Sequence, residues 1–128
     1  MQKILIVDDS ATIRKMVRAS LRGLDGVEFA EAGNGLEAIE HLALGPIGLI
    51  ILDLNMPDMH GVDVLKFVRG HQACRGVPVV VLTTRDDDAS RETVMAAGAT
   101  EYLTKPFAPP VLLSVARDLP SGASVRPG

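Results

Sequence analysis

The chain lacks the features that mark secreted, membrane-spanning and nucleic-acid-binding proteins. Its single cysteine, Cys74, excludes an intramolecular disulfide and fits a reducing compartment. Its longest apolar runs have only the length of a strand, which excludes a transmembrane helix. The formal net charge of -3 gives no support to a nucleic-acid or membrane-surface role. No basic segment followed by a long apolar stretch begins the chain, so we expect a cytoplasmic protein.

What the chain does contain is a regular alternation of short apolar runs and helical patterns. Its 128 residues suit one domain. The apolar runs predict strands at residues 3–7, 27–30, 48–52, 78–82 and 101–103. Helices are predicted after Ser10 as N-cap, at residues 36–44 and 61–69, after Asp88 up to Gly98, and at residues 109–119. In the first helix, one apolar stripe comprises Ile13, Met16, Val17, Leu21 and Leu24.

This alternation predicts an α/β fold. Near-continuous apolar runs are typical of parallel strands that helices cover on both faces, and right-handed crossovers place the helices there. We therefore expect a doubly wound, five-stranded parallel sheet of flavodoxin-like order 2-1-3-4-5. Residues 1–119 would form this domain. Residues 120–128 are rich in Ser, Gly and Pro, and we interpret them as a flexible tail or as the start of a linker.

Chemically active side chains follow the apolar runs. Asp8 and Asp9 come after the first run, Asp53 after the third, Thr83 after the fourth and Lys105 after the fifth. In an open parallel sheet the carboxyl ends of the strands meet at one edge, where ligands bind. We expect these five residues to converge on one site.

Such a cluster of acids suits a metal-assisted phosphoryl site. Two carboxylates about 4 Å apart repel by roughly 4 kcal/mol at an effective dielectric near 20, so three of them require a cation. Mg²⁺ prefers one or two carboxylates and leaves room for phosphate oxygens. Lys105 and Thr83 could stabilise a phosphoryl group by charge and hydrogen bonding, and Asp53 would be the nucleophile.

Four segments carry a resemblance to a known family. They are Asp8–Ser10, residues 53–61 (DLNMPDMHG), Thr83–Thr84 and residues 97–107 (AGATEYLTKPF). In order and spacing they resemble the receiver domains of response regulators, in particular the single-domain receivers of chemotaxis. The match extends from about Lys3 to Leu119.

The resemblance implies a phosphoryl-accepting site. A histidine kinase or phosphotransfer protein would phosphorylate Asp53. Mg²⁺ would be held by Asp9, Asp53 and the backbone carbonyl of Asn55, with Asp8 acting through water. Lys105 would contact the phosphoryl group. The protein itself would turn over no external substrate beyond its own slow dephosphorylation.

The resemblance also implies a switch. The Lys105–Pro106 bond would be cis. Phosphorylation would draw Thr83 inward and let Tyr102 rotate, which changes the output surface read by a downstream target such as a flagellar switch protein. We expect a monomer.

Further surface positions carry predictions of their own. Arg14 and Arg18 lie on a basic face of the first helix that is either a kinase-docking surface or simply solvated, and Leu113 is either a partner contact or partly buried. Asn55 and Arg85 would flank the path of the hydrolytic water, and we predict that Arg85 slows dephosphorylation.

Alternative functions stay open at this point. The chain could be a phosphorelay intermediate or a receiver cut from a longer regulator, although Asn55, Met56 and Tyr102 favour a chemotaxis protein. A haloacid-dehalogenase-like phosphatase also uses an aspartyl phosphate and Mg²⁺. Such an enzyme needs an Asp-x-Asp motif after its first strand, whereas here the adjacent acids Asp8 and Asp9 occupy that place.

Overall fold

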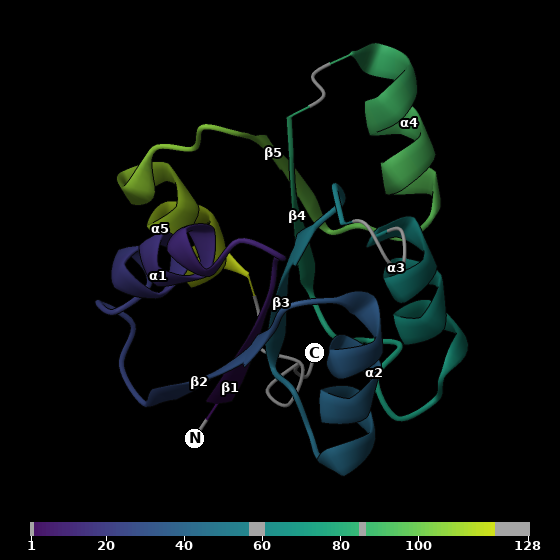
Figure 1. Cartoon of the computed structure of the whole chain (residues 1–128), viewed down its shortest axis with the longest axis horizontal. Helices are drawn as coiled ribbons and strands as arrows, with labels where there is room; N and C mark the ends of the chain where they lie inside the picture. Colours follow the sequence, from purple (N-terminus) through teal and green to yellow (C-terminus); the bar gives the residue numbers. More distant parts are fainter. Residues whose placement is uncertain (1, 57–60, 85–86, 120–128) are drawn as a thin grey trace.

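The computed structural model describes residues 2–56, 61–84 and 87–119. Within them, strands and helices alternate along the chain (Figure 1). The strands are β1 (Gln2–Val7), β2 (Val27–Ala32), β3 (Leu49–Asp53), β4 (Val79–Thr83) and β5 (Glu101–Thr104). The helices are α1 (Ala11–Ser20), α2 (Gly35–Leu44), α3 (Gly61–Gly70), α4 (Asp88–Ala96) and α5 (Pro109–Asp118). None of these helices is long and apolar enough to cross a membrane.

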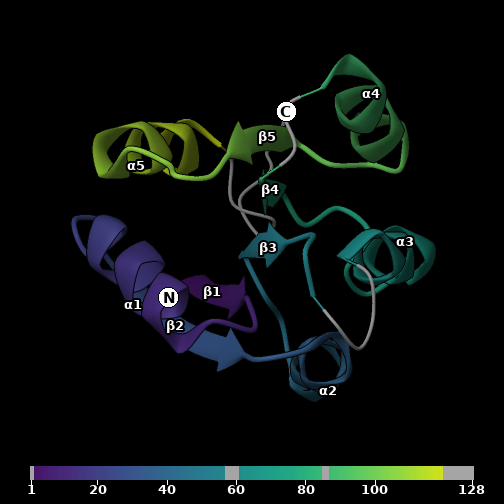
Figure 2. The same cartoon turned by 45° about the horizontal axis from the view of Figure 1, so that its top comes forward.

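The strands form one parallel sheet of order β2-β1-β3-β4-β5. Helices α1 and α5 lie on one face of the sheet, and α2, α3 and α4 lie on the other (Figure 2). The predicted doubly wound sheet and its strand order are therefore confirmed.

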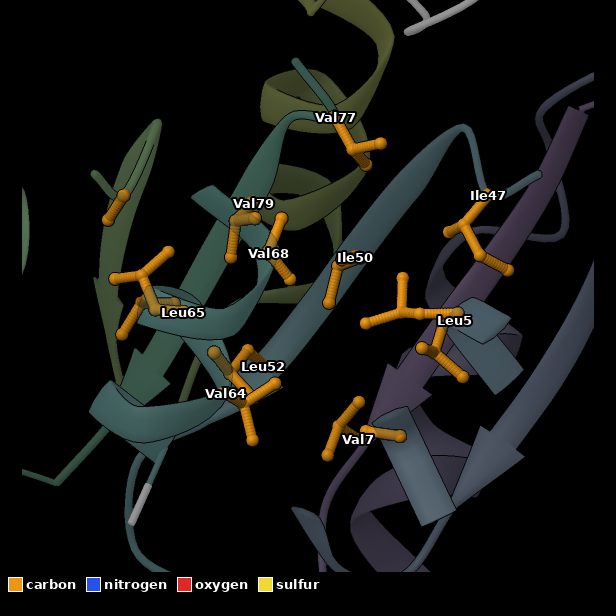
Figure 3. Packing of buried hydrophobic residues seen from close by; sticks show 14 of the residues in the cluster. Leu5, Val7, Ile47, Ile50, Leu52, Val64, Leu65, Val68, Val77 and Val79 are labelled. Atoms are coloured by element: carbon orange, nitrogen blue, oxygen red, sulfur yellow. The ribbon is translucent and has the colours of Figure 1, made fainter. Parts of the chain in front are cut away.

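Alternation of side chains along each strand divides the core into two layers. Leu5 and Val7 belong to the cluster under α2, α3 and α4, whereas Ile4 and Ile6 belong to the cluster under α1 and α5. Figure 3 shows the first cluster, in which strand residues meet the inner face of α3. Full burial of one such side chain contributes roughly 1.5–3 kcal/mol, so both faces of every central strand favour apolar residues.

Element boundaries differ from the sequence-based expectation by one or two residues in most elements, and β2 and α1 show why. Strand β2 continues to Ala32 rather than ending at residue 30, because the ion pairs of Glu31 with Arg14 and Arg18 accommodate a charged residue on this edge strand. Helix α1 ends at Ser20, before the end of the predicted stripe. Met16, which we placed on that stripe, is 42% exposed, whereas Val17 is buried and Ile13 packs partly buried against the core.

Helix termini in the described chain use the expected caps. The Ser10 side chain accepts a hydrogen bond from the Ile13 amide at 3.2 Å, and Asp87 caps α4 by accepting from Ser90. Gly98 follows α4 with a φ of 114°, a backbone conformation that favours glycine. The predicted tail at 120–128 lies outside the described residues and stays a prediction.

Candidate functional site

Polar side chains gather at the carboxyl edge of the sheet. Asp8 follows β1 and Asp53 ends β3, and these two strands are direct neighbours. Thr83 ends β4 and pairs with Thr104 of β5, immediately before Lys105. The Lys105 amide also donates to the Thr83 carbonyl at 2.7 Å. The strand order thus places residues from four strands at one edge.

The three carboxyl groups form one cluster. One oxygen from each of Asp8, Asp9 and Asp53 lies within 4.8 Å of the others. Asp8 is 2% exposed and Asp53 1% exposed, whereas Asp9 faces solvent. Buried carboxylates at this separation repel strongly, because water screens them poorly.

Lys105 partly neutralises this cluster. Its Nζ lies 3.0 Å from Asp8 Oδ2 and 3.0 Å from Asp53 Oδ1, and its side chain is 15% exposed. Burial acts to lower the pKa of Lys105, but the hydrogen bonds and charges of the two carboxylates outweigh it and raise the pKa. When all three acids are ionised, one ammonium leaves an excess of two negative charges, which equals the charge of one divalent cation.

Both carboxylate oxygens of Asp8 accept hydrogen bonds. Oδ1 accepts a hydrogen bond from the Ser10 amide at 2.9 Å, and Oδ2 accepts from Lys105. Burial raises the pKa of Asp8, and the nearby charge of Asp53 adds to the rise, while the contacts from Ser10 and Lys105 oppose it. The surroundings of Asp8 therefore disfavour its ionised form.

One carboxylate oxygen of Asp53 accepts hydrogen bonds, and the other has no hydrogen-bond partner among the described residues. Oδ1 accepts from Lys105 and, at 3.0 Å, from the Asn55 amide. Oδ2 is buried and has no hydrogen-bond partner among the described residues. Buried polar atoms normally have partners, so an unpaired carboxylate oxygen indicates a place for a ligand. A hard cation fits this set of oxygen donors.

Glycine allows α3 to begin against this site. A Cβ on Gly61 would lie 2.6 Å from the Asp53 carbonyl oxygen and 2.7 Å from Leu54 Cα. Real Cβ atoms do not approach backbone so closely, so a larger residue would displace the end of β3. The helix start thus helps to fix the backbone of Asp53.

Asn55 connects the ends of β3 and β4. Its Oδ1 accepts a hydrogen bond from Thr83 Oγ1 at 3.4 Å and another from the Thr84 amide at 3.3 Å. Thr83 is 1% exposed, so its side chain is buried at the end of β4. These long hydrogen bonds are weak and exchangeable.

Tyr102 is buried on the side of the sheet that α4 covers. It is 6% exposed, and the guanidinium of Arg91 in α4 lies 4.6 Å from the centre of its ring. This cation–π contact favours the inward position of the ring.

The Lys105–Pro106 peptide bond is cis.

The residues assigned to partner surfaces have varied environments. The Arg14 side chain is 19% exposed and the Arg18 side chain 45% exposed, and both form ion pairs with Glu31. Leu113 is partly buried and packs against the core under α1 and α5. Arg85 lies outside the described residues, so its role stays a prediction.

Sequence reasoning missed the partners of several arginines. Glu31, which binds Arg14 and Arg18, and Arg91, which covers Tyr102, were not predicted to act in these pairs. Glu31 interrupts an apolar run, and that interruption was the only signal in the sequence. Arg91 carried none, because its contact depends on how α4 packs beside β5.

Comparison with known proteins defines the class. Residues 4–117 match the response regulator receiver domain, and the chain belongs to this family.

The similar proteins include chemotaxis proteins. The chain is 39% identical over 111 residues to chemotaxis protein CheY1 of Helicobacter pylori, a match that covers 86% of this chain and 90% of that protein. Among solved structures, the chemotaxis protein CheY4 of Vibrio cholerae has a TM-score of 0.84 and 38% identity over 91% of this chain and 97% of that one. The Mn²⁺-bound response regulator Rcp1 has a TM-score of 0.77 and 28% identity, covering 91% and 90%. This chain is thus a CheY-like signalling domain.

Proposed function

We propose that this chain is a chemotaxis response regulator that accepts a phosphoryl group on Asp53. The observation that carries the proposal is the state of the Asp53 carboxylate. Lys105 and the Asn55 amide orient it through Oδ1, while Oδ2 has no partner among the described residues. A buried carboxylate that is oriented through one oxygen, and whose other oxygen has no partner among the described residues, is suited to act as a nucleophile.

The transfer itself asks mainly for positioning and charge. A carboxylate oxygen of Asp53 would attack the phosphorus of a phosphohistidine, and the phosphorus–nitrogen bond would break. The electron pair stays on the departing imidazole nitrogen, which takes up a proton. Lys105 would turn part of its interaction from the carboxylates to the phosphoryl oxygens, where negative charge gathers in the transition state.

The acid cluster fits Mg²⁺. Asp9, Asp53 and the backbone carbonyl of Asn55 would hold the ion, with Asp8 acting through water. When bound, Mg²⁺ would offset the repulsion among the carboxylates and neutralise phosphoryl oxygens. The excess negative charge, the oxygen donors and the Mn²⁺-bound relative support this assignment.

Phosphorylation would be read through Thr83 and Tyr102. Thr83 Oγ1 would leave Asn55 Oδ1 and donate to a phosphoryl oxygen, because a dianion is the stronger acceptor. That shift changes the packing beside Tyr102, and the populations of its inward and outward positions change with it. Asn55 and Arg85 would modulate the approach of the hydrolytic water.

The partners follow from the chemotaxis relatives. A sensor histidine kinase or a phosphotransfer protein would supply the phosphoryl group, and a flagellar switch protein would read the output face. Similarity to CheY1 and CheY4 supports this two-component pathway over a phosphorelay role.

The test is the intact mass of the protein after mixing with acetyl phosphate, with and without Mg²⁺. We expect a gain of one phosphoryl group only with Mg²⁺, and no gain in Asp53→Asn. The variant should remain as stable as the parent, because it removes one charge from a repulsive cluster. Phosphorylation of Asp53→Asn, or no gain in the parent, would contradict the proposal.

A further inference from the structure

Arg14 joins three segments of the chain beside the acid cluster. From α1, its Nε donates to Glu31 Oε1 on β2 at 2.9 Å. One terminal nitrogen of the same guanidinium donates to the backbone carbonyl of Asp8 at 2.6 Å. The planar fork of arginine allows both bonds at once, because its donors are held in a fixed relative geometry.

The carbonyl that Arg14 binds belongs to the peptide that leads to Asp9. A peptide unit is planar, so fixing the Asp8 carbonyl also fixes the plane from which Asp9 departs. The other polar groups of Asp8 are engaged by Ala32, Ser10 and Lys105. Arg14 therefore adds to these restraints the hydrogen bond at the carbonyl that is linked directly to Asp9.

Glu31 is the anchor of this arrangement. Its second oxygen accepts from Arg18 at 2.8 Å, and the Arg18 guanidinium also lies 5.3 Å from the centre of the Phe29 ring. Glu31 is thus held from two sides, and its position on β2 is fixed by pairing with Ile6 of β1. The guanidinium of Arg14 is consequently held in place by the sheet rather than by α1 alone.

We propose that Arg14 is a positioning residue for divalent-cation binding: anchored on Glu31, it orients the Asp8–Asp9 peptide so that the Asp9 carboxylate faces Asp8 and Asp53. The inference rests on the proposed Mg²⁺-dependent function and extends it to a residue that does not touch the ion. Residues that orient metal ligands in this way commonly change metal affinity when they are replaced.

Arg18 provides a matched control. It lies on the same helix, carries the same charge and binds the same carboxylate as Arg14. Its hydrogen bond and its ring contact run to Glu31 and Phe29, whereas only Arg14 of the two arginines bonds to Asp8. If the ion pairs acted only through their charge, variants at both positions would change Mg²⁺ affinity. If Arg14 positions the Asp8–Asp9 peptide, only variants at Arg14 would do so.

Charge and positioning also predict opposite signs for Arg14→Gln. Removal of a cation near carboxylates would, by Coulomb's law alone, strengthen binding of another cation. Loss of the bond to the Asp8 carbonyl would weaken binding, because Asp9 is no longer held toward the cluster. The direction of the change therefore separates the two effects.

The experiment is a calorimetric titration of Mg²⁺ into the parent, Arg14→Lys, Arg14→Gln and Arg18→Lys at equal ionic strength. We expect both Arg14 variants to raise the Kd by about tenfold, and Arg18→Lys to stay within about twofold of the parent. Amide exchange at Ser10 should accelerate in the Arg14 variants alone. Thermal unfolding without Mg²⁺ identifies the temperature at which all four proteins are folded, and the titrations are done there.

Equal Kd values for Arg14→Lys and the parent would overturn the inference while leaving the proposed function intact. Tighter binding by Arg14→Gln, or an equal loss in Arg18→Lys, would also overturn it. A parent that binds no Mg²⁺ would overturn both the proposed function and this inference.

Discussion

The two edges of the sheet each hold a partly buried cation, and they use it in opposite ways. At the carboxyl edge, Lys105 Nζ lies 3.0 Å from carboxylate oxygens of Asp8 and Asp53. At the amino edge, Arg69 donates to backbone carbonyls and carries no carboxylate partner among the described residues. These carbonyls are those of Gly98 at 2.9 Å, Arg75 at 3.0 Å and Val77 at 2.6 Å.

The electrostatic consequences differ accordingly. Burial lowers the pKa of Arg69, whose carbonyl partners are neutral. Burial also acts to lower the pKa of Lys105, but its carboxylate partners reverse the direction and raise the pKa. The Arg69 contacts join α3 to the segments that lead into β4 and β5.

The comparison separates a structural use of a cation from a functional one. Carbonyl groups accept the hydrogen bonds of Arg69 and add no negative charge, so these contacts create no demand for a further cation. Lys105 leaves surplus negative charge and an unpaired buried oxygen on Asp53, so the carboxyl edge is less stable alone and open to a ligand.

The largest effect should come from Lys105→Met. We expect phosphoryl acceptance to slow by about 10²–10³-fold, because a group that stabilises developing negative charge is lost. Without Mg²⁺ the variant should also lose about 3 kcal/mol of unfolding free energy, since two buried carboxylates lose their cation. Saturating Mg²⁺ should restore part of that stability. Phosphorylation rates from acetyl phosphate and urea unfolding with and without Mg²⁺ test both expectations, and an unchanged rate would remove Lys105 from the site.

Arg69→Met should affect stability alone. Loss of the charged donor leaves several carbonyls without their partner, and we expect unfolding free energy to fall by about 3 kcal/mol. The phosphorylation rate of the folded variant should stay within about twofold of the parent. Mg²⁺ should restore none of the unfolding free energy that the loss of Arg69 removes. Urea unfolding and the acetyl phosphate assay measure the two quantities. If Mg²⁺ rescued Arg69→Met as it rescues Lys105→Met, the proposed contrast between the edges would disappear.

Arg91 tests whether a third cation is tied to the switch. Arg91→Met removes the cation–π contact with Tyr102, and we expect a loss of about 0.5–1 kcal/mol with a more solvent-accessible ring. The chain has one tyrosine and no tryptophan, so tyrosine fluorescence and its quenching by iodide report on Tyr102 alone. Arg91→Lys, which keeps the charge, is the control. Identical quenching in the parent and Arg91→Met would show that the contact does not hold the ring.

The smallest effect concerns the pH dependence of stability. The pKa of Asp8 is raised above its ordinary value of 3.8, so the folded state holds this proton more tightly than the unfolded state does. The corresponding stabilisation is present below pH 3.8 and is lost as pH rises through the folded pKa. We therefore expect Asp8→Asn to gain stability relative to the parent as pH increases above about 4, without Mg²⁺. Urea unfolding of both proteins across this range measures the difference, and a difference that moves the other way would contradict the assignment.

The fold was largely predictable because local and global signals agree. Apolar runs such as residues 79–82 are buried on both faces, and polar residues at their ends mark one edge of the sheet. The rule that parallel strands end together indicated Asp8, Asp53 and Lys105 before any distance was known. The end of β2 was wrong by two residues, because the ion pairs of Glu31 depend on tertiary structure.

The amino edge could not be predicted in the same way. In the sequence, Arg69 is only a basic residue in the last turn of a helix, and its contacts with Gly98 and Thr100 join residues far apart in the chain. Carbonyl partners leave no trace in residue types. The roles of Arg14 in positioning and of Arg91 beside Tyr102 likewise depend on packing, and Arg85 lies outside the described residues.

The position of the phosphoryl group on the chain can be determined chemically. The protein is treated with acetyl phosphate and Mg²⁺ and then with borohydride, which reduces an acyl phosphate to an alcohol, and peptide mass spectrometry identifies the altered residue. We expect homoserine at position 53 only when Mg²⁺ is present. Homoserine at Asp8 or Asp9 instead, or the same yield at position 53 without Mg²⁺, would contradict it.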